Sequence, residues 1–370
     1  MKLAVAGAMV FLLACVLTPQ GLLDASLYSD VHVYHEYARK MLDGEIPYRD
    51  FSDEYPPLAQ PILLAARSVL AFKLLLAAFG VGIVVLLATV FRSRYAVSVF
   101  AVSPLLVGSI YLNAYDLWPA FLLTSALALF ARQRPRLAFA VLGAAAAAKI
   151  YPAAVLPIAL LFVARSERVR GALLFAGVFL LAHLPFLVLG PGGVRFSYTT
   201  QLRRGLELNS LGSSLLLATG HRQLANEPPG SLNVTGGAAD AVAAASTVLV
   251  VAAVLAAAYL YARGRLSFLT ACAAAIVGFV AFDKVFSAQY VEWLAPLAPL
   301  TGVVAAAGTA VVLLLTHAVF SHRSALAEQR DVALLVARNL AVVALYLWLL
   351  GGRRRRATPR LDHRTSGLDR

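Results

Sequence analysis

The sequence predicts an all-α, polytopic membrane protein, and two observations support that prediction. Of its 370 residues, 60% are hydrophobic and only 14% are charged, whereas a soluble domain is nearer half apolar and a quarter charged. The apolar residues also form continuous runs without strict alternation. Because a spanning segment must pair its own backbone polar groups in lipid, continuous runs indicate helices and exclude barrel strands.

Each apolar run is expected to be a helix, with roughly 10–12 of them crossing the membrane. A full crossing takes about 20 residues, so three of the runs are short. Two of these are expected to form a hairpin that turns at Lys149–Pro152, and the third, "QYVEWLAPLAPL", is expected to be broken by its prolines. In chain order, the runs are 3–18, 69–91, 96–113, 117–131, 137–148, 152–164, 171–189, 239–261, 266–282, 288–300, 301–318 and 331–350.

Arginine-rich clusters between the runs predict the orientation. The clusters "RSR", "RQRPR", "RSERVR", "RGR" and "RRRR" all face the cytoplasm under the positive-inside rule, which places both termini there. They also account for the net charge of +13 without a nucleic-acid partner, since basic clusters contact anionic lipid head groups. Residues 1–350 are expected to form a single membrane domain, and 351–370 a disordered basic cytoplasmic tail. The predicted outer segments are 19–60, 190–238, 283–287 and 319–330.

A dense polar stretch, "YSDVHVYHEYARKMLDGEIPYRDFSDEYPP", follows the first run. Its first half is amphipathic when read as a helix, which is typical of a helix that lies at the membrane interface. Asp30 stands at the start of this helix, and two interpretations of it are open. It is an N-cap, stabilising by about 1 kcal/mol, or it is a partly desolvated general base that takes a proton from an acceptor hydroxyl.

Other polar residues of this stretch allow further interpretations. Asp53 belongs to a proline-stiffened acidic loop that is either a binding-site wall or an ordinary surface loop. His32 and His35 have a spacing compatible with two metal ligands on one helix face. The sequence supplies no evident third or fourth ligand, so no metal site is expected. The patterns of nucleotide, dinucleotide and hydrolase sites are absent, and no cofactor is expected.

Several cations lie where the predicted topology does not need them. Lys149 stands at the tip of the short hairpin and either snorkels to the interface or clamps a phosphate or carboxylate. Arg203 and Arg204 fall in an outer segment, where they either neutralise lipid phosphates or hold the phosphate of a substrate. Lys73, at the beginning of its run, is expected to be an interfacial anchor.

The order of these motifs resembles that of the membrane glycosyltransferases with the C-type (GT-C) fold. The resemblance is nearest to the family 87 polyprenyl-phosphate-mannose transferases of actinobacteria. Asp30, Tyr34, Gly44, Pro47-Tyr48 and Tyr55-Pro56-Pro57 match the first outer loop of that family. Further matches follow in order in "NAYDLWPAFLL", "AAAAAKIYPAAVLPIALL", "FSYTTQLRRGLELNSLGSSL" and "VFSAQYVEWLAPLAPL".

The resemblance implies a GT-C-like helix bundle with an outward-facing cavity, and an inverting transfer in which Asp30 is the catalytic base. The donor is a sugar on polyprenyl phosphate, with mannose favoured, and the acceptor is a lipid, a glycan or a protein. The candidates for binding the donor phosphate are Lys149, Arg203 and Arg204. The candidates for lining the cavity are His32, Tyr34, His35, Asp53, Tyr55, Asp116, Gln289 and Tyr290.

The expected protein is therefore a bacterial plasma-membrane glycosyltransferase of cell-envelope biosynthesis, with its active site on the outer face and membrane lipids around it. Two alternatives are open. A transporter or flippase of lipid-linked glycans would carry broken helices in two similar halves, and the sequence offers only the two short interrupted segments. A membrane protein without catalytic activity is the other alternative.

Overall fold

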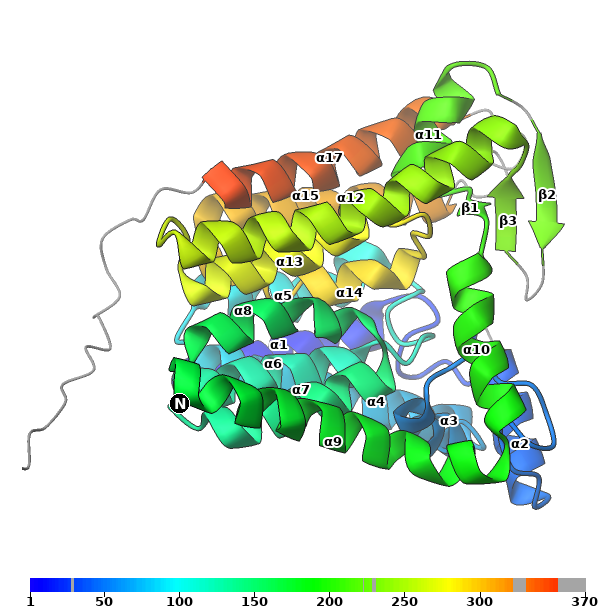
Figure 1. The fold of residues 1–370 in the computed structure, drawn as a ribbon, viewed down its shortest axis with the longest axis horizontal. Helices are drawn as coiled ribbons and strands as arrows, with labels where there is room; N and C mark the ends of the chain where they lie inside the picture. The colour runs from blue at the N-terminus through cyan, green and yellow to red at the C-terminus, as the bar shows by residue number, and fades with distance from the viewer. Residues whose placement is uncertain (28–29, 222, 228–230, 322–330, 352–370) are drawn as a thin grey trace, which may run out of the picture.

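The computed structural model describes residues 1–27, 30–221, 223–227, 231–321 and 331–351. It confirms an all-α, multi-pass membrane protein, to which one small sheet is added (Figure 1). Most of the outer segment 319–330 and nearly all of the tail 351–370 lie outside the described residues, so their predicted structures remain predictions. Among the described helices, five are long and apolar enough to cross a membrane, and six more are apolar over 10–17 residues.

The helices follow the apolar runs of the sequence. The five long ones are α4 (Val69–Thr89), α9 (Arg165–Leu189), α12 (Gly237–Ala262), α15 (Val303–Ser321) and α17 (Val332–Gly351). The shorter apolar ones are α1 (Lys2–Leu17), α5 (Arg94–Val107), α6 (Leu117–Ala131), α7 (Pro135–Ala148), α8 (Leu156–Phe162, preceded by the 3-10 helix η2, Tyr151–Val155) and α13 (Phe268–Phe282).

Serine caps explain where several of these helices begin. The hydroxyl of Ser68 accepts a hydrogen bond from the amide of Ala71 at the start of α4. Ser93 does the same at the start of α5, and Ser267 at the start of α13. Each cap satisfies one of the amides that the first turn of a helix leaves unpaired. The short turns between crossings therefore end one helix and start the next within a few residues.

Two segments are broken helices, as the sequence predicts. Helix α7 ends at Ala148, Lys149 is extended, and the chain re-enters the bundle through η2 and α8. The segment 288–301 consists of η3 (Ala288–Tyr290), α14 (Val291–Leu294) and η4 (Ala298–Thr301). Both segments run only part of the way through the bundle, so their polar ends lie beneath the outer segments.

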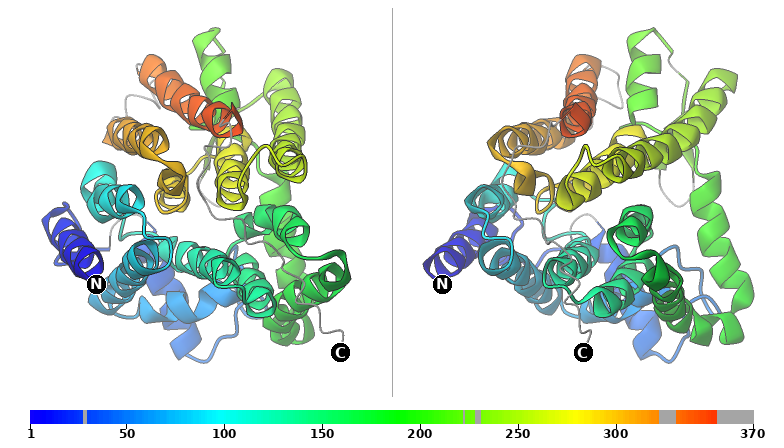
Figure 2. Two further views of the ribbon diagram at one scale, coloured as in Figure 1. Left: turned by 90° about the vertical axis from the view of Figure 1, so that its left-hand side faces the viewer. Right: turned by 60° about the vertical axis from the view of Figure 1, so that its left-hand side comes forward.

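The helices form two groups that face each other. Seen end-on in the left view of Figure 2, the C-terminal helices (yellow to red) form one group and most of the N-terminal helices (blue to green) form the other. Helix α12 packs on α13, and α13 on α17, within the first group, while α6, α7 and α9 pack in sequence within the second. Helix α5 links the groups because it packs against both α1 and α15.

The polar outer segments collect at one end of the bundle (Figure 1). They comprise α2 (Val31–Leu42), η1 (Pro57–Ala59), α3 (Gln60–Ala65), α10 (Pro191–Arg203), α11 (Leu211–Ala218) and the strands β1 (Leu206–Glu207), β2 (Leu224–Glu227) and β3 (Ser231–Val234). The sheet is antiparallel with the order β1-β3-β2, and Leu206 and Leu224 both pair with Val234. The turns that carry the arginine clusters lie at the opposite end.

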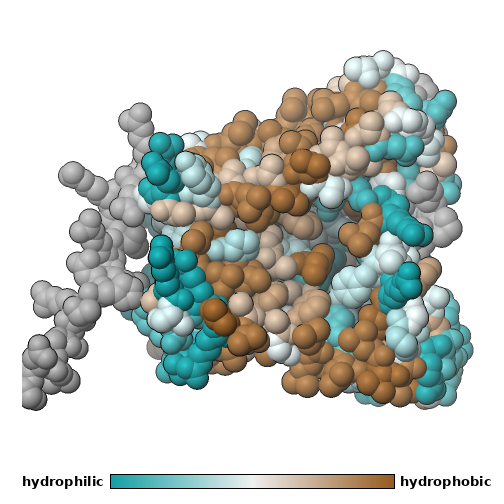
Figure 3. All heavy atoms as spheres, in the orientation of Figure 1, coloured by the Kyte–Doolittle hydropathy of each residue, from teal (hydrophilic) through white to brown (hydrophobic). Residues whose placement is uncertain are grey.

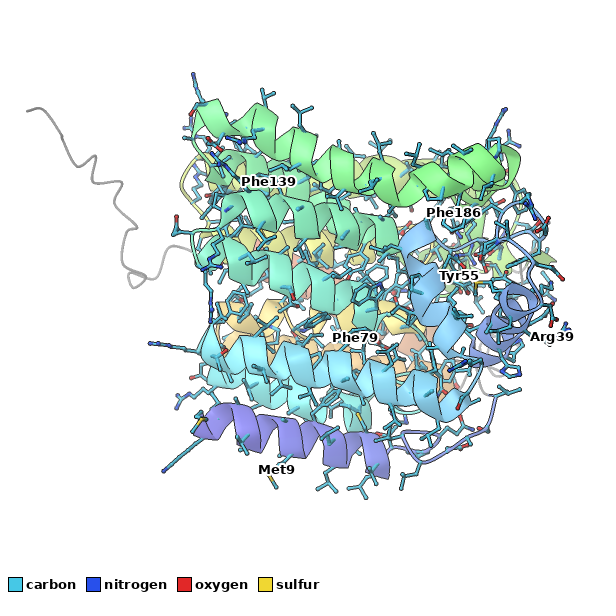
Figure 4. The ribbon with its side chains drawn as sticks, turned by 90° about the horizontal axis from the view of Figure 1, so that it is seen from below. Met9, Arg39, Tyr55, Phe79, Phe139 and Phe186 are labelled. Atoms are coloured by element: carbon cyan, nitrogen blue, oxygen red, sulfur yellow. The ribbon has the colours of Figure 1, made fainter. Side chains whose placement is uncertain are left out.

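On the face shown in Figure 3, the surface of the bundle is mostly apolar between these two polar ends. Helix α9 is an example, since only 6% of its most apolar window is buried inside the protein. Met9 on α1 is 67% exposed and points away from the bundle (Figure 4). Apolar side chains exposed to this extent are expected where lipid is the solvent.

The expectation that Lys73 is an interfacial anchor is wrong. Its side chain is fully buried near the start of α4. The ammonium group donates hydrogen bonds to the carbonyls of Gln20 at 2.8 Å, Gly21 at 3.1 Å and Asp24 at 2.8 Å. Three donors thus meet three acceptors, and Lys73 fixes the chain that leaves α1 instead of contacting lipid head groups.

Candidate active site

A cavity of about 530 Å³ lies at the polar end of the bundle, between the two groups of helices. Its walls come from the start of α2, the turn after α7, helix α10, the segment 283–293 and the facing sides of α12 and α17. Both broken helices therefore end at the cavity. This arrangement brings together side chains that are far apart in the sequence.

Asp30 is the carboxylate at the α2 side of the cavity. It stands at the N-cap position of α2, but its side chain makes no capping hydrogen bond. Instead, Oδ2 accepts a hydrogen bond from Nε2 of Gln289 at 3.2 Å and a long one from the Tyr34 hydroxyl at 3.4 Å. Burial raises the pKa of Asp30, with a further rise from Asp116, while Lys149 opposes it. The capping interpretation of Asp30 therefore has no support in the structure.

Lys149 is held at the hairpin tip by an anion and by aromatic rings. Its ammonium group lies 2.6 Å from Oδ1 of Asp116, and that same oxygen accepts the indole N–H of Trp293 at 2.7 Å. The ammonium also lies over the rings of Tyr115, Tyr290 and Trp293, at 4.8–5.4 Å from their centroids. Such contacts stabilise a cation in a poorly hydrated place. They orient Lys149 toward the cavity, which its side chain lines.

Aromatic side chains pack around the charged groups. Tyr34, Tyr55 and Tyr115 form a cluster with ring centroids 5.4–5.9 Å apart and edge-to-face geometry. In Figure 4, Tyr55 lies between the labelled residues Arg39 of α2 and Phe186 of α9. Rings packed in this way fix their neighbours, because edge-to-face pairs have a preferred geometry. Asp30 thus lies next to aromatic side chains whose positions are fixed by packing.

Helix α10 brings Arg204 to the cavity but keeps Arg203 away from it. Arg204 lies just after the helix, and its Nη1 donates to Oε1 of Gln201 at 3.3 Å. Nε2 of Gln201 in turn donates to Oε2 of Glu54 at 3.3 Å. The buried Nε atom of Arg204 has no hydrogen-bond partner in the described residues. Arg203 is exposed and lines a separate shallow pocket with Arg195 and Thr199.

Two further acids line the cavity. Burial raises the pKa of Asp283 to about 6 and also raises the pKa of Glu54, although Arg204 attracts the Glu54 carboxylate. Next to Asp283, Lys284 donates to the carbonyl of Leu202 at 2.6 Å, which ties α10 to the segment 283–287. The cavity therefore holds opposite charges on several of its walls.

The predicted site residues divide into those that line the cavity and those that do not. The lining residues are Asp30, Tyr55, Lys149, Arg204, Gln289 and Tyr290. Tyr34 and Asp116 contact lining residues from behind, as described above. His35 binds the carbonyl of Ala66 at 2.9 Å, and His32 is exposed.

Asp53 is buried outside the cavity. Its Oδ1 accepts the amide of Tyr55 at 2.8 Å, and its Oδ2 has no partner in the described residues. It shapes the loop that carries Glu54 and Tyr55. Across the described part of the chain, no group of three or more His, Cys, Asp or Glu side chains is arranged to hold a metal ion.

Sequence reasoning missed several residues that form the cavity. Tyr115 and Trp293 occur within quoted motifs, but nothing in their spacing indicates that they meet Lys149. Glu207 and Arg338 line another part of the cavity. For Arg338 a signal exists, because an arginine inside an apolar run costs several kcal/mol unless it is paired or hydrated.

The arrangement has the parts that a group transfer to a hydroxyl requires. A half-buried carboxylate with a raised pKa can accept a proton. Cations across the cavity can stabilise negative charge that develops on a leaving group. Both kinds of group lie where the bundle meets the polar end, so that a lipid-held substrate and a water-soluble group can reach the same place.

The fold and the cavity define a multi-pass α-helical membrane protein with a charged cavity at one end of its bundle. Within that class, the chain belongs to the PIG-U family, described as GPI transamidase subunit PIG-U, whose model matches residues 87–285. Membership of glycosyltransferase family 87, which the motif order suggests, is not what this match identifies and stays a prediction.

Comparison with solved structures finds ArnT from Cupriavidus metallidurans bound to undecaprenyl phosphate. The TM-score is 0.49 and the sequence identity 15%, and the likeness covers 95% of this chain and 76% of that chain. Comparison with curated proteins finds no match.

Proposed function

We propose that the chain is a membrane glycosyltransferase that moves a sugar, with mannose favoured, from a polyprenyl phosphate to a hydroxyl of a lipid or glycan acceptor. The observation that carries the proposal is the position of Asp30. Its side chain is not used as a helix cap and faces a cavity that Lys149 and Arg204 also line. The proposed transfer needs a base for the acceptor hydroxyl and a cation for the leaving phosphate.

The proposed reaction inverts the anomeric carbon. Asp30 takes the proton of the acceptor hydroxyl while the hydroxyl oxygen forms a bond to that carbon. The bond from the carbon to the phosphate oxygen breaks, and the polyprenyl phosphate leaves with the electron pair. Negative charge grows on the phosphate, so a nearby cation lowers the barrier. Arg204 is the main candidate because its Nε has no partner in the described residues, whereas Lys149 already pairs with Asp116.

The proposed location is the bacterial plasma membrane, with the cavity on the outer side. The arginine-rich turns lie at the end of the bundle opposite α2 and α10 (Figure 1), whose residues line the cavity. Under the positive-inside rule those turns are cytoplasmic. A polyprenyl-phosphate donor would then meet its acceptor at the outer surface.

The test is transfer of radiolabelled sugar from polyprenyl-phosphate donors to lipids in membranes that contain wild type or Asp30→Asn. Asn keeps the size of Asp but cannot accept the proton, so transfer should fall about 10²–10⁴-fold with the protein level unchanged. Asp283→Asn is the matched variant, because Asp283 also lines the cavity. Wild-type transfer in Asp30→Asn together with its loss in Asp283→Asn would move the base to Asp283 and contradict the proposal.

The family match favours a second candidate. The family is described as a transamidase subunit, which suggests a subunit that holds a lipid-linked glycan in this cavity for a partner enzyme. Such a subunit would bind the glycolipid, and neither the wild type nor Asp30→Asn would transfer sugar from any donor. A lack of transfer by wild-type membranes, together with retained glycolipid binding, would therefore select this candidate.

A further inference from the structure

Arg338 is a buried cation of α17 that lines the cavity. It stands near the polar end of α17, one of the helices long enough to cross a membrane, and is only 1% exposed. Its side chain nevertheless lines the cavity. None of the salt bridges formed by the described residues includes it. Its Nε is buried without a hydrogen-bond partner in the same set of residues.

The contacts that Arg338 does make leave its Nε without an acceptor in the described residues. One terminal nitrogen donates to the carbonyl of Asn209 at 2.6 Å, and the guanidinium lies 3.7 Å from the ring centroid of Phe286. Glu207 is close enough to attract it electrostatically. However, the Glu207 carboxylate already accepts hydrogen bonds from Asn209 and from the Phe286 amide, at 2.6–3.2 Å. Glu207 therefore does not need Arg338 as a donor.

A purely structural role does not require an arginine here. The task of tying the Asn209 loop to α17 is also performed by the neighbouring Asn339. Its side-chain amide donates to the carbonyls of Asn209 at 3.2 Å and Ser210 at 3.1 Å. A neutral amide makes these bonds without the cost of burying a charge. The Nε of Arg338 is thus a donor that these structural contacts do not use.

Aromatic side chains lie between Arg338 and Lys149. Lys149 lies over Tyr290, Tyr290 stacks with Phe286 at 6.4 Å, and Phe286 carries Arg338 on its face. The cavity that Arg338 lines also has an apolar part of its wall, with Val250 and Val251 of α12 and Val319 and Phe320 of α15. Val251 is also 54% exposed, so packing against other helices does not seal this part of the cavity wall.

We propose that Arg338 binds the phosphate of an anionic membrane lipid that enters along α12 and serves as the acceptor. A guanidinium matches a phosphate geometrically and offers two parallel hydrogen bonds. The free Nε and the apolar wall beside it fit a phosphate attached to acyl chains better than a free anion. The role of this lipid as acceptor rests on the proposed transferase function, whereas its binding does not.

The experiment uses the full chain purified in an uncharged detergent. Thermal unfolding is followed with a thiol-reactive dye, since Cys15 and Cys272 are both buried and become accessible only on unfolding. Dioctanoyl phosphatidic acid is titrated, and dioctanoyl glycerol and inorganic phosphate are titrated in parallel. The phosphatidic acid should raise the unfolding midpoint saturably. The glycerolipid and inorganic phosphate should raise it little.

The variants separate the charge of Arg338 from its structural contacts. Arg338→Gln should weaken the response to phosphatidic acid about ten- to a hundredfold in concentration. Asn339→Ala should lower the midpoint without lipid but keep the wild-type lipid response. If Arg338→Gln does not fold, Arg338→Lys decides, with a several-fold weaker response expected because the planar fork is lost.

Three results would overturn the inference. They are an unchanged lipid response in the Arg338 variant that folds, equal protection by dioctanoyl glycerol, and equal protection by inorganic phosphate, which would indicate a site for a soluble anion. Asp30→Asn serves as the independent control. If Asp30→Asn keeps transfer while Arg338 governs lipid binding, the role assigned to Asp30 fails and the lipid site stands.

Discussion

At the scale of single residues, the partner of Asp30 determines how the proposed base behaves. Gln289 donates a hydrogen bond to Asp30 across 259 residues of sequence, and a hydrogen bond to a carboxylate favours its charged form. Burial acts in the opposite direction and raises the Asp30 pKa above its ordinary value of 3.8. Together with the charges of Asp116 and Lys149, these two effects influence the pH at which the base becomes ionised.

Gln289→Leu should therefore shift the pH dependence of transfer. A base must be deprotonated to act, so the transfer rate rises with pH through the Asp30 pKa. Loss of the Gln289 hydrogen bond raises that pKa further and moves the acid limb of the pH–rate profile to higher pH. The profiles of wild type and Gln289→Leu, measured in the same membranes, test this. An acid limb at the same pH in both proteins would show that Asp30 is not the group that titrates.

Asp53 gives a stability prediction that is independent of catalysis. It is fully buried, and burial raises its pKa from 3.8 to about 7. The folded protein keeps the proton up to about pH 7, whereas the unfolded chain loses it near pH 3.8. Stability is therefore lost as the pH rises from about 4 to about 7, and the loss is complete above that range.

Asp53→Asn should remove this pH dependence, because Asn keeps the oxygen that accepts the Tyr55 amide and carries no charge. At pH 8 the variant should be more stable than wild type by on the order of a few kcal/mol, and near pH 4 the two should be equal. Unfolding midpoints measured from pH 4 to pH 8 test this. Parallel pH profiles for the two proteins would mean that Asp53 is not protonated in the folded state.

At the scale of elements, the position of α10 depends on glycine. A Cβ atom on Gly193 would overlap the backbone carbonyl of Tyr48, so the start of α10 lies directly against the loop that leads to Tyr55. Tyr198, from the same helix, bonds His183 of α9 at 2.5 Å. The helix that carries Gln201 to the cavity is therefore fixed at its start by close backbone packing. In its middle, it is fixed by the bond from Tyr198 to the buried His183 of α9.

Gly193→Ala should displace α10, because the atom that it meets belongs to the backbone and cannot rotate away. Overpacking of this kind costs about 1–3 kcal/mol, and sugar transfer should fall because Arg204 moves with the helix. Gly192→Ala is the matched control in the same helix, since its Cβ would meet nothing within 4 Å. Thermal unfolding and transfer are measured for both variants. Equal behaviour of the two would show that α10 does not need this close approach.

At the scale of the whole molecule, the sequence predicts the helices better than it predicts their meeting points. Apolar runs and prolines place both broken segments, since those signals are local. The pair of Lys149 and Asp116 is not predictable in this way, because it joins residues from different crossings. The same holds for Gln289 and Asp30. Arg203 and Arg204 are adjacent and chemically equal, and only the end of α10 separates the residue that lines the cavity from the one that does not.

The orientation of the bundle gives the last prediction. The turns between helices that carry arginine clusters lie at the end of the bundle opposite α2 and α10, whose residues line the cavity. The proposed function requires the cavity end to face outward. Cys15 and Cys272 are buried and can be replaced by Ala to give a background without cysteine. Ser26 is exposed at the cavity end and Ser166 at the arginine-rich end, so a single cysteine at each position reports on one side of the membrane.

In intact cells, Ser26→Cys should react with a membrane-impermeant maleimide, whereas Ser166→Cys should react only after the cells are permeabilised. The reason is that Arg165, Arg168 and Arg170 hold the start of α9 in the cytoplasm. The two variants control for each other, since both are exposed serines beside an apolar helix. Labelling of Ser166→Cys alone in intact cells would place the cavity in the cytoplasm. The donor and acceptor would then have to meet on the inner side, and a transferase acting on the outer surface would be excluded.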